Sequence, residues 1–213
     1  MKKITLTAAQ ISKVYNGKSI FKGVSFEITQ NTSFAITGKN GAGKSTLIKI
    51  LCRVLSQTKG TIQLHVDQEV IEEQNYFKHI GLVSPYLNLY EEFSAEENLQ
   101  FIKNVRGLRN ATVEKCNHLL ERFGIYEHRK KEVKNYSSGM KQRLKYCAAL
   151  LHDPLILVLD EPSSNLDEFG IAAVHETMKQ QKSNGILIFG TNDKDDLQFA
   201  DSMCNLDELE IGK

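Results

Sequence analysis

The chain has 213 residues, of which 41% are apolar and 25% are charged, and its formal net charge is +1. This composition is typical of a folded globular protein, and the length suits one α/β domain or a domain with a small lobe. The small net charge argues against nucleic acid as a partner. No apolar run reaches the ~18 residues needed to cross a membrane, so we expect no membrane span.

The N-terminus and the cysteines indicate the cellular compartment in which the protein works. The opening segment MKKITLTAAQ has two lysines but no continuous apolar stretch, unlike a secretory signal. The cysteines are far apart and form no C-x-x-C, so we expect reduced, buried thiols and neither disulfides nor a metal site. They are Cys52, Cys116, Cys147 and Cys204. Both observations predict a cytoplasmic protein.

A strand, a glycine-rich loop and a helix follow one another early in the chain. Residues 24–28 alternate apolar and polar side chains, as a half-buried strand does. Residues 34–37 are continuously apolar, which is typical of a strand covered on both faces. The next residues, GKNGAGKST at 38–46, fit G-x-x-x-x-G-K-[ST], and an apolar run at 47–51 continues as the expected helix.

This loop predicts a site for nucleotide phosphates. Its backbone N–H groups and the helix N-terminus would surround phosphate oxygens, and Gly41 and Gly43 would allow close approach. Lys44 would reach the β- and γ-phosphates, and the Ser45 hydroxyl would contact Mg²⁺. A flexible glycine turn is the alternative, but it has no use for that lysine and serine. The predicted nucleotide-binding residues of the loop are Gly38, Asn40, Gly41, Ala42, Gly43, Lys44, Ser45 and Thr46, with Asn40 either a phosphate donor or loop filler.

The middle of the chain changes from strands to helices. Residues 62–66 alternate as a half-buried strand, and residues 80–84 form another strand. The pair Ser94 and Glu97 has the spacing of a capping box, and Thr112 begins a second helix. We therefore expect a helical lobe at about residues 90–135 within a single domain that spans residues 1–213.

A second anion site is predicted at the start of a later helix. Residues 135–143 read NYSSGMKQR, and the helix continues to about residue 151. Ser137, Ser138 and Gly139 leave backbone N–H groups free at its N-terminus. One chain cannot easily offer two separated phosphate sites to one nucleotide, but a head-to-tail pair of chains can. An ordinary serine N-cap is the alternative.

An apolar strand at residues 155–159 ends in two acids. If it ends beside the glycine loop, Asp160 can hold Mg²⁺ through its water shell. Glu161 would then orient or deprotonate the water that attacks the γ-phosphate. The alternative is a strand that simply ends in solvated acids. A further apolar strand at residues 186–190 leads to Asn192.

Taken in order and spacing, GKNGAGKST, YSSGMKQR and LVLDEPSSNLD resemble the ATP-binding subunit of ABC transporters over essentially the whole chain. The resemblance implies an α/β P-loop NTPase fold with an ABC-type antiparallel β portion and a helical subdomain, with ATP and Mg²⁺ as ligands. It also implies that Tyr15 stacks on adenine, although Tyr15 could be an ordinary surface aromatic near a turn. Ser137 and Gly139 would contact the γ-phosphate of a partner chain, and Asp167 would line the dimer seam.

The chain departs from that family pattern at two places. The family usually has a glutamine after the strand at residues 80–84, which contacts Mg²⁺, whereas Pro85 or Tyr86 stands here. Neither residue offers a side-chain amide, so water would have to complete the metal shell. The family usually reads T-H-D where this chain has Asn192, which donates a hydrogen bond but carries no proton. We expect either slower hydrolysis with ATP binding retained, or a native solution with full activity.

The resemblance implies a dimeric ATPase subunit, paired with itself or with a similar subunit, that powers export through a separate membrane permease. It would lie at the inner face of the cell membrane and dock the permease around residues 86–93. In its length and in the segment YSSGMKQRL, the chain resembles subunits assigned to haem export in cytochrome c maturation. The alternatives are a soluble ATPase of the cluster-assembly type and an ATP-gated clamp that scarcely hydrolyses. A small-molecule kinase would not need the YSSGMKQR segment.

Overall fold

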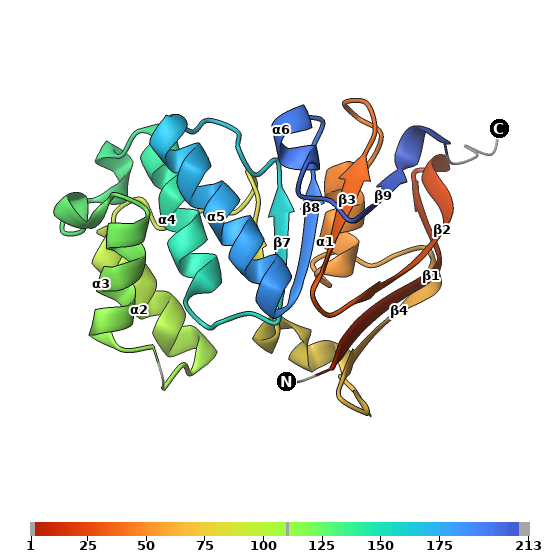
Figure 1. Cartoon of the computed structure of the whole chain (residues 1–213), viewed down its shortest axis with the longest axis horizontal. Helices are drawn as coiled ribbons and strands as arrows, with labels where there is room; N and C mark the ends of the chain where they lie inside the picture. Colours follow the sequence, from red (N-terminus) through yellow and green to blue (C-terminus); the bar gives the residue numbers. More distant parts are fainter. Residues whose placement is uncertain (1–2, 110, 209–213) are drawn as a thin grey trace.

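The computed structural model describes residues 3–109 and 111–208, which form two sheets with helices around them (Figure 1). The strands are β1 (Ile4–Tyr15), β2 (Lys18–Thr29), β3 (Thr32–Thr37), β4 (Lys59–Val66), β5 (Glu69–Val70), β6 (Ile80–Val83), β7 (Ile156–Asp160), β8 (Ile186–Gly190) and β9 (Ser202–Asn205). The α-helices are α1 (Lys44–Leu51), α2 (Ala95–Arg106), α3 (Val113–Arg122), α4 (Ser138–Leu150), α5 (Glu168–Asn184) and α6 (Lys194–Leu197). Short 3₁₀ segments are η1 (Glu73–Lys78), η2 (Tyr126–His128), η3 (Val133–Asn135) and η4 (Leu206–Glu208).

The parallel sheet has the strand order β6-β7-β8-β3-β9. Every residue of β7 and β8 is buried, which explains why these strands are uninterrupted apolar runs in the sequence. The register pairs Val83 with Leu159, Asp160 with Gly190, and Ile36 also with Gly190. The carboxyl ends of four neighbouring strands therefore meet at one edge of the sheet, and the loops that follow them lie together there.

The antiparallel sheet has the order β2-β1-β4-β5 and lies at the opposite end of the molecule from α2 and α3 (Figure 1). Its inward side chains, among them Leu6 and Leu64, share one buried cluster with Leu47 and Ile48 of α1 and with Ile188 of β8. Helix α1 thus packs between the two sheets. This packing fixes the direction of the helix whose first residue follows the glycine loop.

The helical lobe has its own buried core with α4. Leu99 of α2 and Leu120 of α3 are fully buried there, with Leu144 of α4. The capping box is confirmed, because the Ser94 hydroxyl accepts from the Glu97 N–H at 3.2 Å and the Glu97 carboxylate accepts from the Ser94 N–H at 2.8 Å. Reciprocal bonds of this kind satisfy two backbone donors at the start of α2.

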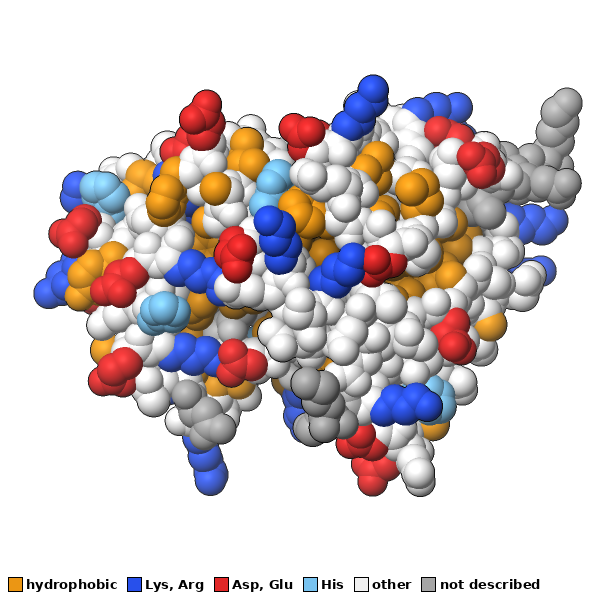
Figure 2. Space-filling model, in the orientation of Figure 1, with side chains coloured by type: hydrophobic (Ala, Val, Ile, Leu, Met, Phe, Trp, Pro, Cys, Tyr) orange, Lys and Arg blue, Asp and Glu red, His pale blue; other side chains and the backbone are white. Residues whose placement is uncertain are grey.

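The surface carries mixed charge. On the face drawn in Figure 2, acidic and basic side chains are interspersed, as the net charge of +1 leads one to expect. Within the described ranges, no helix is both long enough and apolar enough to cross a lipid bilayer. The prediction that the cysteines are buried is right for Cys147 alone, since the other three thiols are only partly covered.

Candidate functional site: a phosphate loop at the edge of the parallel sheet

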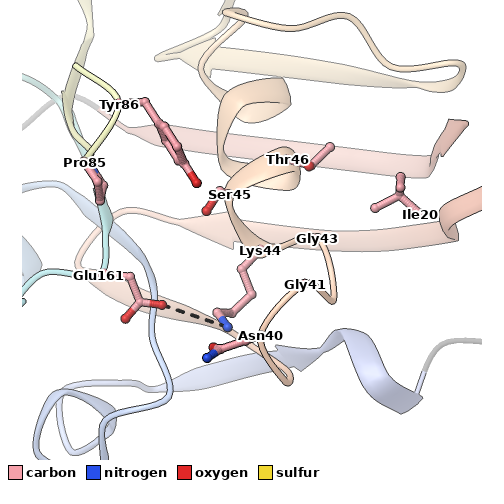
Figure 3. A pocket seen from close by; sticks show the side chains of 10 residues that line it. All are labelled: Ile20, Asn40, Gly41, Gly43, Lys44, Ser45, Thr46, Pro85, Tyr86 and Glu161. Carbon is pink, nitrogen blue, oxygen red and sulfur yellow. Dashed lines mark ion pairs between the residues drawn. The ribbon is translucent and has the colours of Figure 1, made fainter. Parts of the chain in front are cut away.

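A cavity of about 360 Å³ opens at the carboxyl edge of the parallel sheet, between the glycine loop and the loop after β6 (Figure 3). Its lining combines loop backbone, one buried lysine, hydroxyls and a carboxylate. The lining residues are Ile20, Asn40, Gly41, Gly43, Lys44, Ser45, Thr46, Pro85, Tyr86 and Glu161. Most of the residues predicted from the glycine pattern therefore share one cavity with Glu161, which is more than a hundred residues away in the sequence.

The path of the loop requires glycine at its end. Gly43 has φ of 107°, and a Cβ there would lie 2.7 Å from Cγ2 of Ile20. Only glycine tolerates both the left-handed backbone and that close approach. Two bonds close the rest of the loop: the Ala42 N–H donates to the Lys39 carbonyl at 3.0 Å, and the Lys39 N–H donates to the Asp207 carboxylate at 2.8 Å. Ala42 thus helps to fix the shape of the loop but does not itself line the cavity.

Lys44 is the buried cation of the cavity, with 6% of its surface exposed. Its Nζ donates to the Gly38 carbonyl at 2.7 Å and lies 3.9 Å from Oε1 of Glu161. Figure 3 shows this ammonium group directed toward both Glu161 and Asn40. A cation held at that point can attract the phosphate oxygens of a nucleotide.

A hydroxyl–carboxylate cluster lies beside the first turn of α1. The Ser45 hydroxyl donates to Oδ1 of Asp160 at 3.1 Å, and the Ser84 hydroxyl donates to Oδ2 of Asp160 at 3.3 Å. Burial raises the pKa of the Asp160 carboxyl, and the hydrogen bonds from the two serines oppose that shift. Oxygen ligands of this kind are what Mg²⁺ prefers. The donor set therefore fits the predicted metal, with Ser84 as an addition that the sequence did not indicate.

Glu161 occupies an unusual backbone position. Its φ is 54°, in the left-handed region that non-glycine residues rarely adopt, and its N–H donates to the Gly190 carbonyl at 2.9 Å. Burial raises the pKa of its carboxyl, nearby acids add to that shift, and Lys44 opposes it. A carboxylate with a raised pKa is better suited to take a proton from water.

The loop after β8 reaches the glycine loop through Asn192. Its side-chain amide donates to Oδ1 of Asn40 at 3.3 Å. Behind it, the buried Asp196 accepts from the Thr191 hydroxyl at 2.9 Å and from the Ser163 hydroxyl at 2.5 Å. Ser163 follows Glu161 by two residues, so Asp196 ties the Asn192 loop to the Glu161 loop. A fully bonded buried carboxylate of this kind stiffens the loops that it joins.

Pro85 and Tyr86, where the family pattern has glutamine, form the wall of the cavity opposite the glycine loop (Figure 3). The Nζ of Lys49 lies 3.9 Å from the centre of the Tyr86 ring. Lys145 donates from α4 to the carbonyls of Ser84 and Pro85, at 3.2 Å each. This segment is therefore fixed both by a cation–π contact and by backbone bonds.

Tyr15, predicted to stack on adenine, lies at the end of β1 with 43% of its surface exposed. The Nζ of Lys13 lies 4.6 Å from the centre of its ring. In the described part of the chain, Tyr15 is not among the residues that line the cavity, whereas Ile20 of the adjoining strand β2 is. Stacking on adenine stays a prediction.

Two of the four residues predicted to act across a dimer, Ser137 and Asp167, cap helices within this chain. The Ser137 hydroxyl accepts from the Met140 N–H at 3.2 Å and caps α4, which is the alternative considered for this serine. Ser138 is exposed and Gly139 is half-buried beside it. Asp167 caps α5 by accepting from the Gly170 N–H at 2.8 Å, and its other oxygen lies 3.6 Å from Arg143. Contacts of Ser137, Ser138, Gly139 and Asp167 with a second chain stay predictions.

Sequence reasoning missed three residues that build the site. Ser84 directly follows β6, and the pairing of β6 with β7 would have placed it beside Asp160 had that pairing been known. Ile20 belongs to a strand of the other sheet. Asp207 is 168 residues from Lys39, to which it bonds, and no local pattern signals such a contact.

A glycine loop between β3 and α1, a buried lysine and a hydroxyl-bound carboxylate at the end of β7 in the same parallel sheet define a P-loop nucleoside triphosphatase. The family model described as ABC transporter matches residues 21–164, and the chain belongs to that family, through its ATP-binding domain. The predicted fold class, an α/β P-loop domain with an antiparallel β portion and helices beside it, is confirmed.

Two curated relatives illustrate the similarity. The chain is 35% identical to the uncharacterized ABC transporter ATP-binding protein YxlF of Bacillus subtilis (strain 168), over 94% of this chain and 65% of YxlF. It is 33% identical to the lantibiotic transport ATP-binding protein SrtF of Streptococcus pyogenes, over 86% of this chain and 77% of SrtF. The chain spans 65% of the length of YxlF, and 60% and 58% of the lengths of two further relatives from Bacillus subtilis. These three relatives are therefore longer proteins.

Two solved structures share the fold. One, the ATP-binding subunit of an ABC transporter, superposes with a TM-score of 0.80 at 26% identity, over 94% of this chain and 85% of the other. The second is a dimeric ATP-binding cassette in a post-hydrolysis state, bound to ADP and phosphate. It has a TM-score of 0.82 at 20% identity, over 97% of this chain and 95% of the other. At that lower identity the likeness concerns the fold alone.

Proposed function

We propose that this chain hydrolyses ATP to ADP and phosphate and thereby powers export through a separate membrane permease. One observation carries the proposal: Lys44, Ser45 and Glu161 line a single cavity, with Asp160 bonded to Ser45 behind them. Membership of the ABC transporter family supports it. So do relatives named as lantibiotic and bacitracin transport ATP-binding proteins.

In this proposal the chain's own residues divide the work. Lys44 and the loop amides hold the phosphates and offset the charge that develops during in-line attack on the γ-phosphate. Glu161 orients the attacking water and accepts its proton, for which its raised pKa is suited. Ser45 and Asp160 would hold Mg²⁺, which supplies charge neutralisation at the β- and γ-phosphates when bound.

The working unit would be a dimer, of this chain with itself or with a similar subunit. Ser137 and Ser138 are exposed at the start of α4, where N–H groups can meet an anion from another molecule. Asp167 lies on the loop just before α5, with 62% of its side chain exposed. A dimeric ATP-binding cassette among the structures of the same fold supports this arrangement.

We further propose that the permease docks at an apolar groove of about 290 Å³ between the segment that follows α1, η1, α2 and α4. Phe77 and Leu87 line it and are exposed, and Tyr90 is exposed nearby. Arg106 and Lys145 also line the groove, so the occupant would be an amphipathic permease segment with apolar and acidic side chains. An ATPase docked there would work at the cytoplasmic face of the membrane, where ATP is available.

The cargo is proposed from the relatives. Linearmycin resistance, lantibiotic transport and bacitracin transport are the functions named for three of them, which favours an antibiotic or a peptide as the exported substance. Among these relatives none is named for haem, so the similarity to haem-export subunits gains no support. A cluster-assembly ATPase gains none either.

Slow hydrolysis is a separate proposal that rests on Asn192. Its amide reaches the glycine loop, where it can hold a phosphate oxygen by a hydrogen bond but cannot supply a proton. In the extreme case the protein would be an ATP-gated clamp that binds nucleotide and scarcely turns it over.

Lys44→Ala tests the assignment as a whole. We expect ATPase activity to fall by about 100-fold or more, because the buried cation facing the phosphates is removed. Lys59→Ala, which removes an exposed lysine of β4, serves as the matched control and should leave turnover unchanged. Activity retained in Lys44→Ala would overturn the assignment. Co-purification of the tagged chain with a permease from membranes would support the transport role over a soluble one.

A further inference from the structure

The loop after β6 carries a buried serine whose position follows from the sheet. Strands β6 and β7 pair in parallel with Val83 opposite Leu159, so the next residues along, Ser84 and Asp160, are also neighbours. Ser84 is 3% exposed and Asp160 is 1% exposed. The Ser84 hydroxyl donates to Oδ2 of Asp160 at 3.3 Å, while Ser45 donates to Oδ1 at 3.1 Å.

Asp160 is therefore held from both sides. Each of its oxygens accepts one serine hydroxyl, one from the first turn of α1 and one from the end of β6. A carboxylate oxygen has two lone pairs, so each oxygen keeps capacity for a further partner. Orientation by such outer contacts sets how well a carboxylate serves a metal ion or its water shell.

Among the described residues, the side-chain hydrogen bonds to Asp160 come from Ser45 and Ser84, and neither of the two residues that follow Ser84 donates one. Pro85 has no polar side-chain atom, and the ring of Tyr86 is engaged by Lys49 at 3.9 Å. Lys145 meanwhile fixes the backbone here by donating to the carbonyls of Ser84 and Pro85. The side chain directed at Asp160 from this loop is that of Ser84.

We propose that Ser84 is a positioning residue that orients Asp160 toward nucleotide-bound Mg²⁺, in a chain whose next two residues offer no amide for that purpose. The proposal rests on the ATP-dependent function proposed above. A purely structural role is the competing explanation, because a buried hydroxyl needs a hydrogen-bond partner wherever it lies. The two explanations differ in whether the loss of Ser84 changes the response to metal.

The test measures binding of a fluorescent ATP analogue to the full chain while MgCl₂ is titrated, and again in EDTA. For Ser84→Ala we expect the Mg²⁺ concentration at half-saturation to rise by about tenfold. This is the lower end of the loss in metal affinity that follows when a residue that orients a metal ligand is removed. Ser84→Thr, which keeps the hydroxyl, should restore the wild-type value. Affinity in EDTA should be unchanged. Ser183→Ala, which removes an exposed serine of α5 that bonds only within its helix, is the matched control.

Each outcome is decisive. If wild type binds the analogue without any response to Mg²⁺, the proposed function fails. If wild type responds and Ser84→Ala has the same half-saturation, this inference is overturned and the proposed function stands. An equal loss of affinity with and without metal would assign Ser84 a structural role only. If Ser84→Ala does not fold, Ser84→Cys decides by the same titration, because its thiol matches serine closely in shape but is a weak hydrogen-bond donor.

Discussion

The side-chain amide of Asn192 donates to Oδ1 of Asn40 across 3.3 Å, so the loop after β8 is joined directly to the glycine loop. The bond is between neutral groups and exposed residues, and bonds of that kind are weak. An imidazole at position 192 could accept or carry a proton beside the γ-phosphate, which an amide cannot. The identity of this one side chain thus bears directly on the rate of hydrolysis.

Asn192→His is expected to raise ATP turnover of the intact transporter by about tenfold. The reason is that a charge-assisted hydrogen bond to a phosphate exceeds a neutral one by roughly 1–1.5 kcal/mol. Steady-state phosphate release measures it, with ATP affinity as the control that should stay constant. If the histidine variant is no faster than wild type, asparagine is a fully active solution in this chain.

Glu161→Gln should retain ATP and lose turnover by about 100-fold or more, since the amide cannot accept the proton of the attacking water. Position 161 has a left-handed backbone, with φ of 54°, and glutamine adopts this conformation as readily as glutamate does, so the fold should be unaffected. Size-exclusion chromatography with ATP should show a trapped dimer for the variant. A wild-type protein that already forms the same locked dimer would favour the clamp.

The acidic limb of the pH–rate profile should follow Glu161. Burial raises the pKa of this carboxyl, so the base becomes active only as pH rises through a value above the usual 4.5. Turnover measured from pH 5 to pH 8 should rise along that limb in wild type, and Glu161→Gln should show a flat residual rate. A wild-type limb at or below the usual pKa of glutamate would contradict the assignment of Glu161 as the base.

Gly43→Ala should destabilise the protein by about 1–3 kcal/mol, because φ of 107° is strained for alanine and its Cβ would meet Ile20. Nucleotide binding should be lost with it. Gly17→Ala separates the two causes, since Gly17 also has a positive φ of 78° but no atom lies within 4 Å of its added Cβ. Thermal unfolding of both variants measures the difference. Equal destabilisation would show that the Ile20 contact contributes nothing.

His152 should make stability fall in mild acid. Burial, with a smaller contribution from Arg106, lowers the pKa of His152 to about 4, whereas the pKa of histidine in the unfolded chain is about 6.5. As pH falls through that window, the unfolded state takes up the proton first, so the free energy of unfolding decreases, by about 1–2 kcal/mol at pH 5. Urea unfolding at pH 7 and pH 5 measures this slope. It should shrink in His152→Gln but persist in His118→Gln, which removes an exposed histidine.

Local patterns predicted the parts of the fold that have local causes. The fully buried strands β7 and β8 are plain apolar runs, and the capping box announces α2 because both partners lie within four residues. Strand β1 is not among the predicted elements, and its register with β2 shifts after Ala8, where Gln10 has a φ of 53°.

The candidate site divides in the same way. Short sequence motifs were enough to predict the chemistry of residues 38–46, Asp160 and Glu161. Ser84 and Asp207 join the site only because distant strands pair or distant loops touch, at separations of 76 and 168 residues. Such contacts depend on the order of strands in the sheet, which no stretch of this single sequence encodes locally.

Strands β7 and β8 are buried along their whole length, and the loops that leave them carry Glu161 and Asn192. Backbone amides in strands of this kind exchange with solvent deuterium only when the sheet itself opens, whereas loop amides exchange through small local motions. Bound ATP would accordingly slow exchange in the glycine loop and in the loop after β8, while leaving the two strands as they were. The reacting groups are therefore carried at the ends of the strands that open least often. Only the short loops around them are free to change when nucleotide binds.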